Sequence, residues 1–186
     1  DINISNENNY SASGTCSENG ETVAIVITDS GSGSVSPSPQ PTCTSGAWSF
    51  TGLNVSSLAQ GNALVSVNHS DAAGNPANQA DDNILVDTMI PTVTITTPAS
   101  DISLANENNY LVSGTCSENG QNVNIVLTDS GSTNVSLIKL CGGGSWSVIV
   151  GDNFDVSSLS DGTITITADH DDAVGNAAIQ ASTNIN

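Results

Sequence analysis

Positive charge is almost absent from this sequence. Its 186 residues include one basic side chain, Lys139, and nineteen acidic ones, giving a formal net charge of −18. Nucleic acids and anionic membrane surfaces bind proteins through basic residues that displace counterions. The composition therefore argues against both as partners and suits the binding of cations.

Long apolar runs are missing as well. None approaches the ~18 consecutive apolar residues that span a bilayer, and no signal peptide heads the chain. We therefore expect no membrane insertion, and we interpret the sequence as a soluble piece or a mature, excised one. Charged residues are only 11% of the chain, which differs from a disordered acidic tail, so the chain is expected to fold.

Internal repetition sets the organisation of the chain. The stretch SGTCSENG occurs at 13–20 and again at 113–120. Further stretches return at nearly the same spacing, namely NENNY, TDSGS, VSSL and the related pair HSDAAGN and HDDAVGN. This period suits a small whole domain and is too long for a solenoid unit. The sequence therefore predicts two copies of one domain, at 1–87 and 88–186.

Within each copy the apolar residues recur with a period of two, and no window has helical periodicity. Val23, Ile25 and Ile27 alternate with residues that are expected to face water. The first-copy strands, which the second copy repeats, are expected near 10–16, 22–28, 33–43, 47–51, 62–68 and 78–86. Turn signals separate them. This pattern predicts an all-β fold of two tandem immunoglobulin-like antiparallel β-sandwiches.

The second copy has one more expected strand, TVTITTP at 92–98. The first copy has no counterpart, because Asp1 aligns with Asp101. The chain also stops at Asn186, which aligns with Leu85. We interpret both ends as cut from a longer array.

Each copy contains two cysteines. Cys16 and Cys116 are expected to point inward near the end of a strand, and Cys43 and Cys141 precede a turn at the same pole. Symmetry favours the intradomain pairs Cys16–Cys43 and Cys116–Cys141. Such loops would stabilise each domain by roughly 3 to 4 kcal/mol in the chain-entropy account and would indicate an oxidising compartment. Buried free thiols or metal binding by the cysteine pairs are the alternatives.

The junction reads DNILVDTMIPTVTI. A VDTxxP boundary, a DAAGN turn and a following SGTxSENG strand and turn resemble the bacterial immunoglobulin-like repeats of very large secreted surface adhesins. The resemblance covers nearly the whole chain. It implies an extracellular, cell-surface stalk or adhesive array, with neighbouring repeats of the same chain and host or cell-surface ligands as partners, and with calcium at domain boundaries. Two departures stand out. Many such repeats lack cysteines, and the turn expected as LADG reads LAQG at 58–61, although the second copy retains LSDG at 159–162.

Acidic residues support calcium on their own terms. In a sandwich, the SENG turn and the turn before the last strand share a pole with the incoming linker. Carboxylates without a nearby base repel one another unless a hard cation with oxygen ligands lies among them. In the second copy the candidate ligands are Asp87, Glu118, Asn119, Asp171 and Asp172. In the first copy they are Glu18, Asn19 and Asp71. The alternative is a set of solvated acidic turns.

The remaining polar and aromatic residues favour no other function. His69 and His170 lack a second ligand at metal spacing and are expected at strand-end surfaces, while Trp48 and Trp146 are expected in the core. Catalysis needs unlike titratable groups in one pocket, and none is indicated, so no enzyme is predicted. We expect a calcium-rigidified spacer or stalk. The alternatives are a carbohydrate- or other ligand-binding module, and a filament subunit completed by a neighbour's strand.

Overall fold

The computed structural model describes residues 1–96 and 101–186. Contacts within the chain divide it into unit 1, Asp1–Met89, and unit 2, Ile90–Asn186. The boundary proposed from the sequence follows Asp87, two residues earlier. No helix among the described residues is long and apolar enough to cross a membrane.

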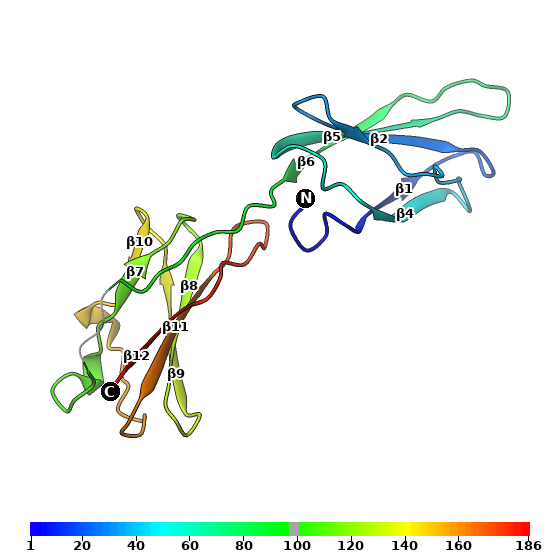
Figure 1. Ribbon diagram of the computed structural model, residues 1–186. Helices are drawn as coiled ribbons and strands as arrows, with labels where there is room; N and C mark the ends of the chain where they lie inside the picture. Colours follow the sequence, from blue (N-terminus) through cyan, green and yellow to red (C-terminus); the bar gives the residue numbers. More distant parts are fainter. Residues whose placement is uncertain (97–100) are drawn as a thin grey trace. The chain divides into compact units, whose positions relative to one another are not determined.

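Unit 1 is a sandwich of two antiparallel sheets (Figure 1). One sheet has the order β1–β4 and the other the order β3–β2–β5–β6. The strands are β1 (Tyr10–Thr15), β2 (Val23–Asp29), β3 (Ser34–Val35), β4 (Ala47–Leu53), β5 (Gly61–His69) and β6 (Ala80–Val86).

Unit 2 repeats this arrangement with the sheets β7–β10 and β9–β8–β11–β12. Its strands are β7 (Ser113–Thr115), β8 (Asn122–Thr128), β9 (Asn134–Leu140), β10 (Ser145–Ser147), β11 (Ile164–His170) and β12 (Ala181–Ile185). Two single-turn 3₁₀ helices, η1 (Glu107–Asn109) and η2 (Val150–Asp152), are the helical segments of the described chain. The predicted all-β fold of two sandwiches is confirmed.

The alternation of side chains explains how each sandwich closes. Val23, Ile25 and Ile27 of β2 are buried, whereas the intervening Ala24 and its counterpart Asn124 are exposed. Each fully buried aliphatic side chain contributes about 1.5–3 kcal/mol through removal from water. Because only one face of each strand is apolar, the sheets pack face to face and place polar residues outside.

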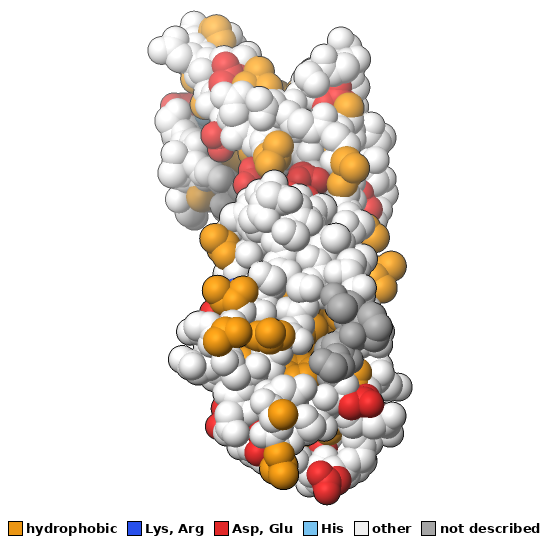
Figure 2. Space-filling model, turned by 90° about the vertical axis from the view of Figure 1, so that its left-hand side faces the viewer, with side chains coloured by type: hydrophobic (Ala, Val, Ile, Leu, Met, Phe, Trp, Pro, Cys, Tyr) orange, Lys and Arg blue, Asp and Glu red, His pale blue; other side chains and the backbone are white. Residues whose placement is uncertain are grey.

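The surface is correspondingly polar. Figure 2 shows acidic side chains scattered among uncharged polar groups on the face drawn, without a continuous acidic patch on the described part of that face. Repulsion among the nineteen acidic residues is thereby spread over the surface, since like charges further apart than about 8–10 Å are screened by salt.

Matching hydrogen bonds in the two units support the alignment of Asp1 with Asp101. The Asp1 carboxylate accepts a hydrogen bond from the Leu85 amide at 2.9 Å, and the Asp101 carboxylate accepts one from the Asn186 amide at 3.0 Å. The two units are thus built alike down to single side-chain contacts.

The strand predicted at 33–43 is wrong in unit 1, where β3 covers only Ser34–Val35. Pro37, Pro39 and Pro41 lack the amide hydrogen that a strand ladder needs. The Gln40 side chain replaces part of the missing ladder. Its amide oxygen accepts from the Ile25 amide and its nitrogen donates to the Ile25 carbonyl, both at 2.9 Å. In unit 2 the full strand β9 pairs with β8 here.

The additional strand predicted at 92–98 is present in part. Thr94 and Thr96 donate to the carbonyls of Thr115 and Ser113, at 3.0 and 3.1 Å, so this segment runs antiparallel beside β7. A regular bridge forms only between Val93 and Cys116. Residues 97 and 98 lie outside the described residues. The strand expected to match 10–16 in the second copy is also shorter, since β7 has three residues.

Candidate functional site

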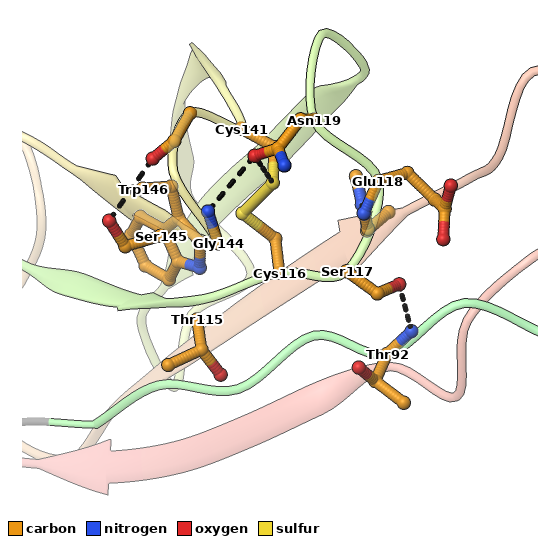
Figure 3. Close-up of a disulfide and its surroundings, with 12 residues drawn as sticks. Thr92, Thr115, Cys116, Ser117, Glu118, Asn119, Cys141, Gly144, Ser145 and Trp146 are labelled. Carbon is orange, nitrogen blue, oxygen red and sulfur yellow. Dashed lines mark hydrogen bonds between the residues drawn. A yellow bond between two sulfur atoms is a disulfide. The ribbon is translucent and has the colours of Figure 1, made fainter.

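The repeated SENG turn is fastened to a disulfide in both units. Cys16 is bonded to Cys43 and Cys116 to Cys141, as the sequence predicted, and the described residues include no free cysteine. The Asn119 side-chain oxygen accepts a hydrogen bond from the Gly144 amide at 2.9 Å (Figure 3).

Unit 1 has the same fastening, since the Asn19 oxygen accepts from the Gly46 amide at 2.9 Å. The last residue of the turn, Gly20 or Gly120, has a φ of 93° or 88°, a region that side chains rarely adopt. Three features therefore explain why SENG recurs. The preceding cysteine forms the disulfide, the asparagine side chain accepts a backbone hydrogen bond, and the glycine adopts a positive φ.

A histidine side chain also hydrogen-bonds the backbone of the SENG turn, and the sequence analysis did not predict this contact. In unit 2 the Glu118 amide donates to His170 Nε2 at 3.1 Å, and His170 Nδ1 lies 2.9 Å from the Asn122 carbonyl. Because Nε2 accepts, the hydrogen-bond network assigns the proton to Nδ1, which donates to that carbonyl. His69 makes the equivalent contacts with the Glu18 amide and the Thr22 carbonyl.

The expectation that both histidines have surface roles is wrong for His170, which is only 2% exposed. Its two ring nitrogens are satisfied by backbone groups, so burial of the ring leaves neither unpaired. The available signal was the presence of a histidine at the same position in both copies, two residues before the aspartate of the DxxGN loop.

Each DxxGN loop is closed by its own aspartate. Asp172 accepts hydrogen bonds from the amides of Val174 and Asn176, at 2.9 and 2.8 Å, and from the Asn176 side chain at 2.7 Å. Burial by itself would raise the pKa of Asp172, but these donors outweigh it and lower the pKa below its ordinary value. Asp71 forms the same loop with Ala73 and Asn75, and the Asn75 hydrogen bonds lower its pKa.

A hollow of about 530 Å³ lies beside this loop in unit 2. Asp169, Asp171 and Asp172 line it together with His170. Glu118 and Asn119 are not among its lining residues. The structure therefore brings two of the predicted calcium ligands, Asp171 and Asp172, to one surface and turns Asn119 toward the disulfide.

The linker enters unit 2 at the SENG turn. Ser117 donates its amide to the Thr92 carbonyl at 3.0 Å, and its hydroxyl accepts from the Thr92 amide at 2.9 Å (Figure 3). Glu118 follows directly, with its carboxylate directed away from the disulfide in Figure 3. The linker backbone therefore lies next to one of the acidic residues named from the sequence, Glu118.

Asp87 lies at the end of unit 1, where its carboxylate accepts from the Met89 amide at 3.1 Å. Gln60, the residue that departs from the LADG pattern, binds the next residue. It accepts from the Thr88 amide at 2.9 Å and donates to the Thr88 hydroxyl at 2.6 Å. The departure therefore fixes the segment that leaves unit 1.

The described acidic residues within a single unit do not form a cluster that could bind Ca²⁺ by itself. Over 1–96 and 101–186, no group of three or more His, Cys, Asp or Glu side chains is close enough to hold a metal ion. Asn119 already accepts a hydrogen bond from the Gly144 amide in the turn before β10, and Asp172 accepts one from the Asn176 amide of its own loop. Glu118 and Asp171 have no side-chain partner among the described residues, which leaves their oxygens available.

Solved structures resemble the chain as a whole. A Ca²⁺-stabilised adhesin that helps an Antarctic bacterium reach out and bind ice is 22% identical, with a TM-score of 0.50 over 99% of this chain and 45% of that one. This chain and the Antarctic bacterial adhesin share a fold. A tetra-tandem repeat from the extending region of a large adhesion protein is 28% identical, with a TM-score of 0.46 over 97% of this chain and 46% of that one.

A region of a 1.5-MDa bacterial ice-binding adhesin, studied for host cell surface retention, is 18% identical. Its TM-score is 0.48 over 99% of this chain and 59% of that one. The chain thus spans about half the length of the first of these structures. No family model and no curated protein matches the sequence.

A second aspartate pair also escaped the sequence analysis. In the TDSGS hairpin, Asp29 accepts from the amides of Gly33 and Ala59, at 2.7 and 2.6 Å. Asp129 accepts likewise from Thr133 and Ser160, at 2.8 and 2.9 Å. Each aspartate latches the hairpin to the loop before β5 or β11. The repetition of TDSGS was the available signal, and the sequence analysis used it only as evidence of two copies.

Proposed function

We propose that this chain is a structural spacer segment of an extracellular bacterial surface adhesin, with a mechanical rather than a catalytic role. The observation that carries the proposal is the construction of each unit. Each is a β-sandwich with its own core and its own disulfide, and the two follow one another without an intervening domain. Tandem domains of this kind extend a chain by repetition.

Other features support the same role. The sequence motifs resemble those of adhesin repeats, and disulfides persist in oxidising compartments outside the cytosol. Both tryptophans are buried, so neither provides the exposed aromatic platform of a carbohydrate-binding module. The partners in this proposal are neighbouring repeats and ligands at a host or other cell surface.

We further propose that Ca²⁺ stiffens the linker between the units. The candidate ligands are the oxygens of Asp87 from the linker, with Glu118, Asp171 and Asp172 from unit 2, while Asn119, Glu18 and Asp71 complete the set named from the sequence. Carboxylate oxygens are the ligands that Ca²⁺ prefers, and the single lysine of the chain is paired with Asp152. The Antarctic adhesin that shares this fold is Ca²⁺-stabilised.

Small-angle scattering of the full chain tests the calcium proposal. With millimolar Ca²⁺ we expect a narrower distribution of maximum dimensions than with a chelator, because a shared ion would restrain the linker. Asp87→Ala should abolish the difference. Asp161→Ala, which removes an exposed carboxylate from a loop outside the candidate set, should preserve it. Coincident profiles and no heat of Ca²⁺ binding by calorimetry would refute the calcium step.

A further inference from the structure

The two units differ at one sheet edge. In unit 2, residues 92–96 lie beside β7, where the carbonyls of Thr115 and Ser113 accept hydrogen bonds from Thr94 and Thr96. In unit 1, β1 pairs only with β4, and the sheet has two strands. Because alternate residues of a strand direct their backbone groups to opposite sides, Ser13 and Thr15 of β1 direct theirs away from β4. Among the described residues, no strand pairs with this side of β1.

The side chains beneath the edge differ in the same way. In unit 2, Val93 is 7% exposed and Ile95 packs against the core, so this segment covers the end of the sandwich. In unit 1 a groove of about 220 Å³ lies there, lined by residues that include Tyr10, Ala12, Trp48 and Val67. Tyr10 and Ala12 are half-buried, whereas Tyr110 and Val112 are buried.

The tryptophans give the most specific contrast. Trp146 donates its indole hydrogen to the Thr94 carbonyl at 3.1 Å. Trp48 is 8% exposed and lines the groove, yet its indole nitrogen has no hydrogen-bond partner among the described residues. The Trp48 indole N–H is not among the buried unpaired groups of the described residues, so it reaches the open side of the groove, where an added carbonyl could accept its hydrogen.

In each unit a glycine lies against the indole ring, and its lack of a side chain leaves space for a carbonyl to approach the indole N–H. A Cβ on Gly114 would overlap the Thr94 carbonyl oxygen and lie 2.6 Å from the Trp146 ring, so the carbonyl can reach the indole only over a glycine. Unit 1 has Gly14 at this position, where a Cβ would lie 2.7 Å from the Trp48 ring. Unit 1 therefore retains the space that a strand carbonyl fills in unit 2.

We infer that the β1 edge of unit 1 is an acceptor site for one added β-strand, whose carbonyl accepts the Trp48 indole hydrogen. The occupant is an extended segment of the chemistry seen at 92–96, in which β-branched apolar residues alternate with threonine. The apolar side chains enter the groove and the backbone pairs with Ser13 and Thr15, as in β-strand addition. This inference is independent of the calcium proposal.

The test attaches such a strand to the full chain. The eleven residues of 90–100 are added directly before Asp1, in the order that they have before Asp101. In the matched control, the added copies of Val93 and Ile95 are changed to Asp. Hydrogen exchange of the Trp48 indole is then followed by NMR, with the Trp146 indole as the internal reference.

We expect the added strand to slow exchange of the Trp48 indole on the order of tenfold, toward the rate of Trp146, since one new hydrogen bond in a covered site gives a factor of that size. The Ser17 amide should slow in parallel, because its counterpart Ser117 donates to Thr92. The Asp-containing control should leave both rates unchanged. Equal Trp48 rates in the two extended chains would overturn the inference.

Discussion

His69 and His170 make the same hydrogen bonds in different surroundings. Both bridge a glutamate amide and a strand carbonyl, but His170 is buried and His69 is partly exposed. Water can replace the lost partners at an exposed site, whereas at a buried site the amide and the carbonyl remain unpaired. The cost of removing each ring should therefore depend on its burial.

We predict that His170→Ala destabilises unit 2 by about 2–4 kcal/mol, from unpaired backbone groups and the cavity left behind. His69→Ala should destabilise unit 1 by less than about 1 kcal/mol. Each unit has one tryptophan, so thermal unfolding followed through the indole signals of Trp48 and Trp146 measures the two units separately. Equal losses of stability in the two units would show that the burial of His170 does not determine the cost of removing the ring.

The aspartate of the DxxGN loop predicts a dependence on pH. Because the folded state lowers the pKa of Asp172 below its ordinary value of 3.8, its contribution to stability is present above that value and is lost as the pH falls through the folded-state pKa. We predict that Asp172→Asn lowers the unfolding temperature of unit 2 at pH 7 by several degrees, the scale of about 4–8 °C that 1 kcal/mol produces in a domain of this size.

The difference between the wild-type chain and Asp172→Asn should shrink as the pH is lowered from 4 toward 2, since the wild-type carboxylate then becomes protonated. Calorimetry across this range measures it. Asp171→Asn is the matched control, because Asp171 is exposed and has no side-chain partner among the described residues. A difference that persists unchanged at pH 2 would contradict the assigned cause.

At the scale of elements, the segment with three prolines beside β2 shows how a strand can be replaced. The sequence predicted a strand at 33–43, and the structure has two strand residues followed by an irregular segment. Gln40 imitates the missing residue through its side chain, which presents one donor and one acceptor to the Ile25 backbone. A side-chain amide has the same pair of groups as a peptide bond, so the edge of β2 stays satisfied here.

We predict that Gln40→Leu destabilises unit 1 by about 1–3 kcal/mol, because the Ile25 amide and carbonyl lose both partners. The Ile25 amide should exchange its hydrogen faster, which NMR measures directly. Gln40→Glu keeps an acceptor for the amide and removes the donor, so it should have an intermediate effect. An unchanged Ile25 exchange rate in Gln40→Leu would exclude the ladder role of Gln40.

Residue alternation predicted most strands, and together with the symmetry of the two copies it predicted both disulfides. It fixes which face of a strand is buried, and Cys16 and Cys43 follow from that at one pole. The proline segment was mispredicted because its apolar and polar residues still alternate, while the missing amide hydrogens decide the pairing.

At the scale of the whole molecule, the candidate ligands show where prediction from sequence ends. Ca²⁺ binds the same kinds of oxygen that accept backbone amides, and the sequence alone did not show that Asn119 and Asp172 accept such hydrogen bonds. Only local geometry separates an aspartate that closes its own loop from one that is available to a cation, as Asp171 is. The hydrogen bonds of His69 and His170 to the SENG turn were missed for a related reason, since the burial of a side chain at the end of a strand depends on how the neighbouring loop folds.

The positions of the bonded cysteines along the chain govern how far this protein can lengthen under load. The bonded cysteines are 27 residues apart in unit 1 and 25 in unit 2. A pulling force that unravels a unit cannot draw out the residues between them, because the covalent bond carries the tension past that segment. At about 3.3–3.6 Å per extended residue, each disulfide withholds about 90 Å of slack. A tether of such units gives way in shorter steps, so the distance between the anchored ends changes less when a single unit fails.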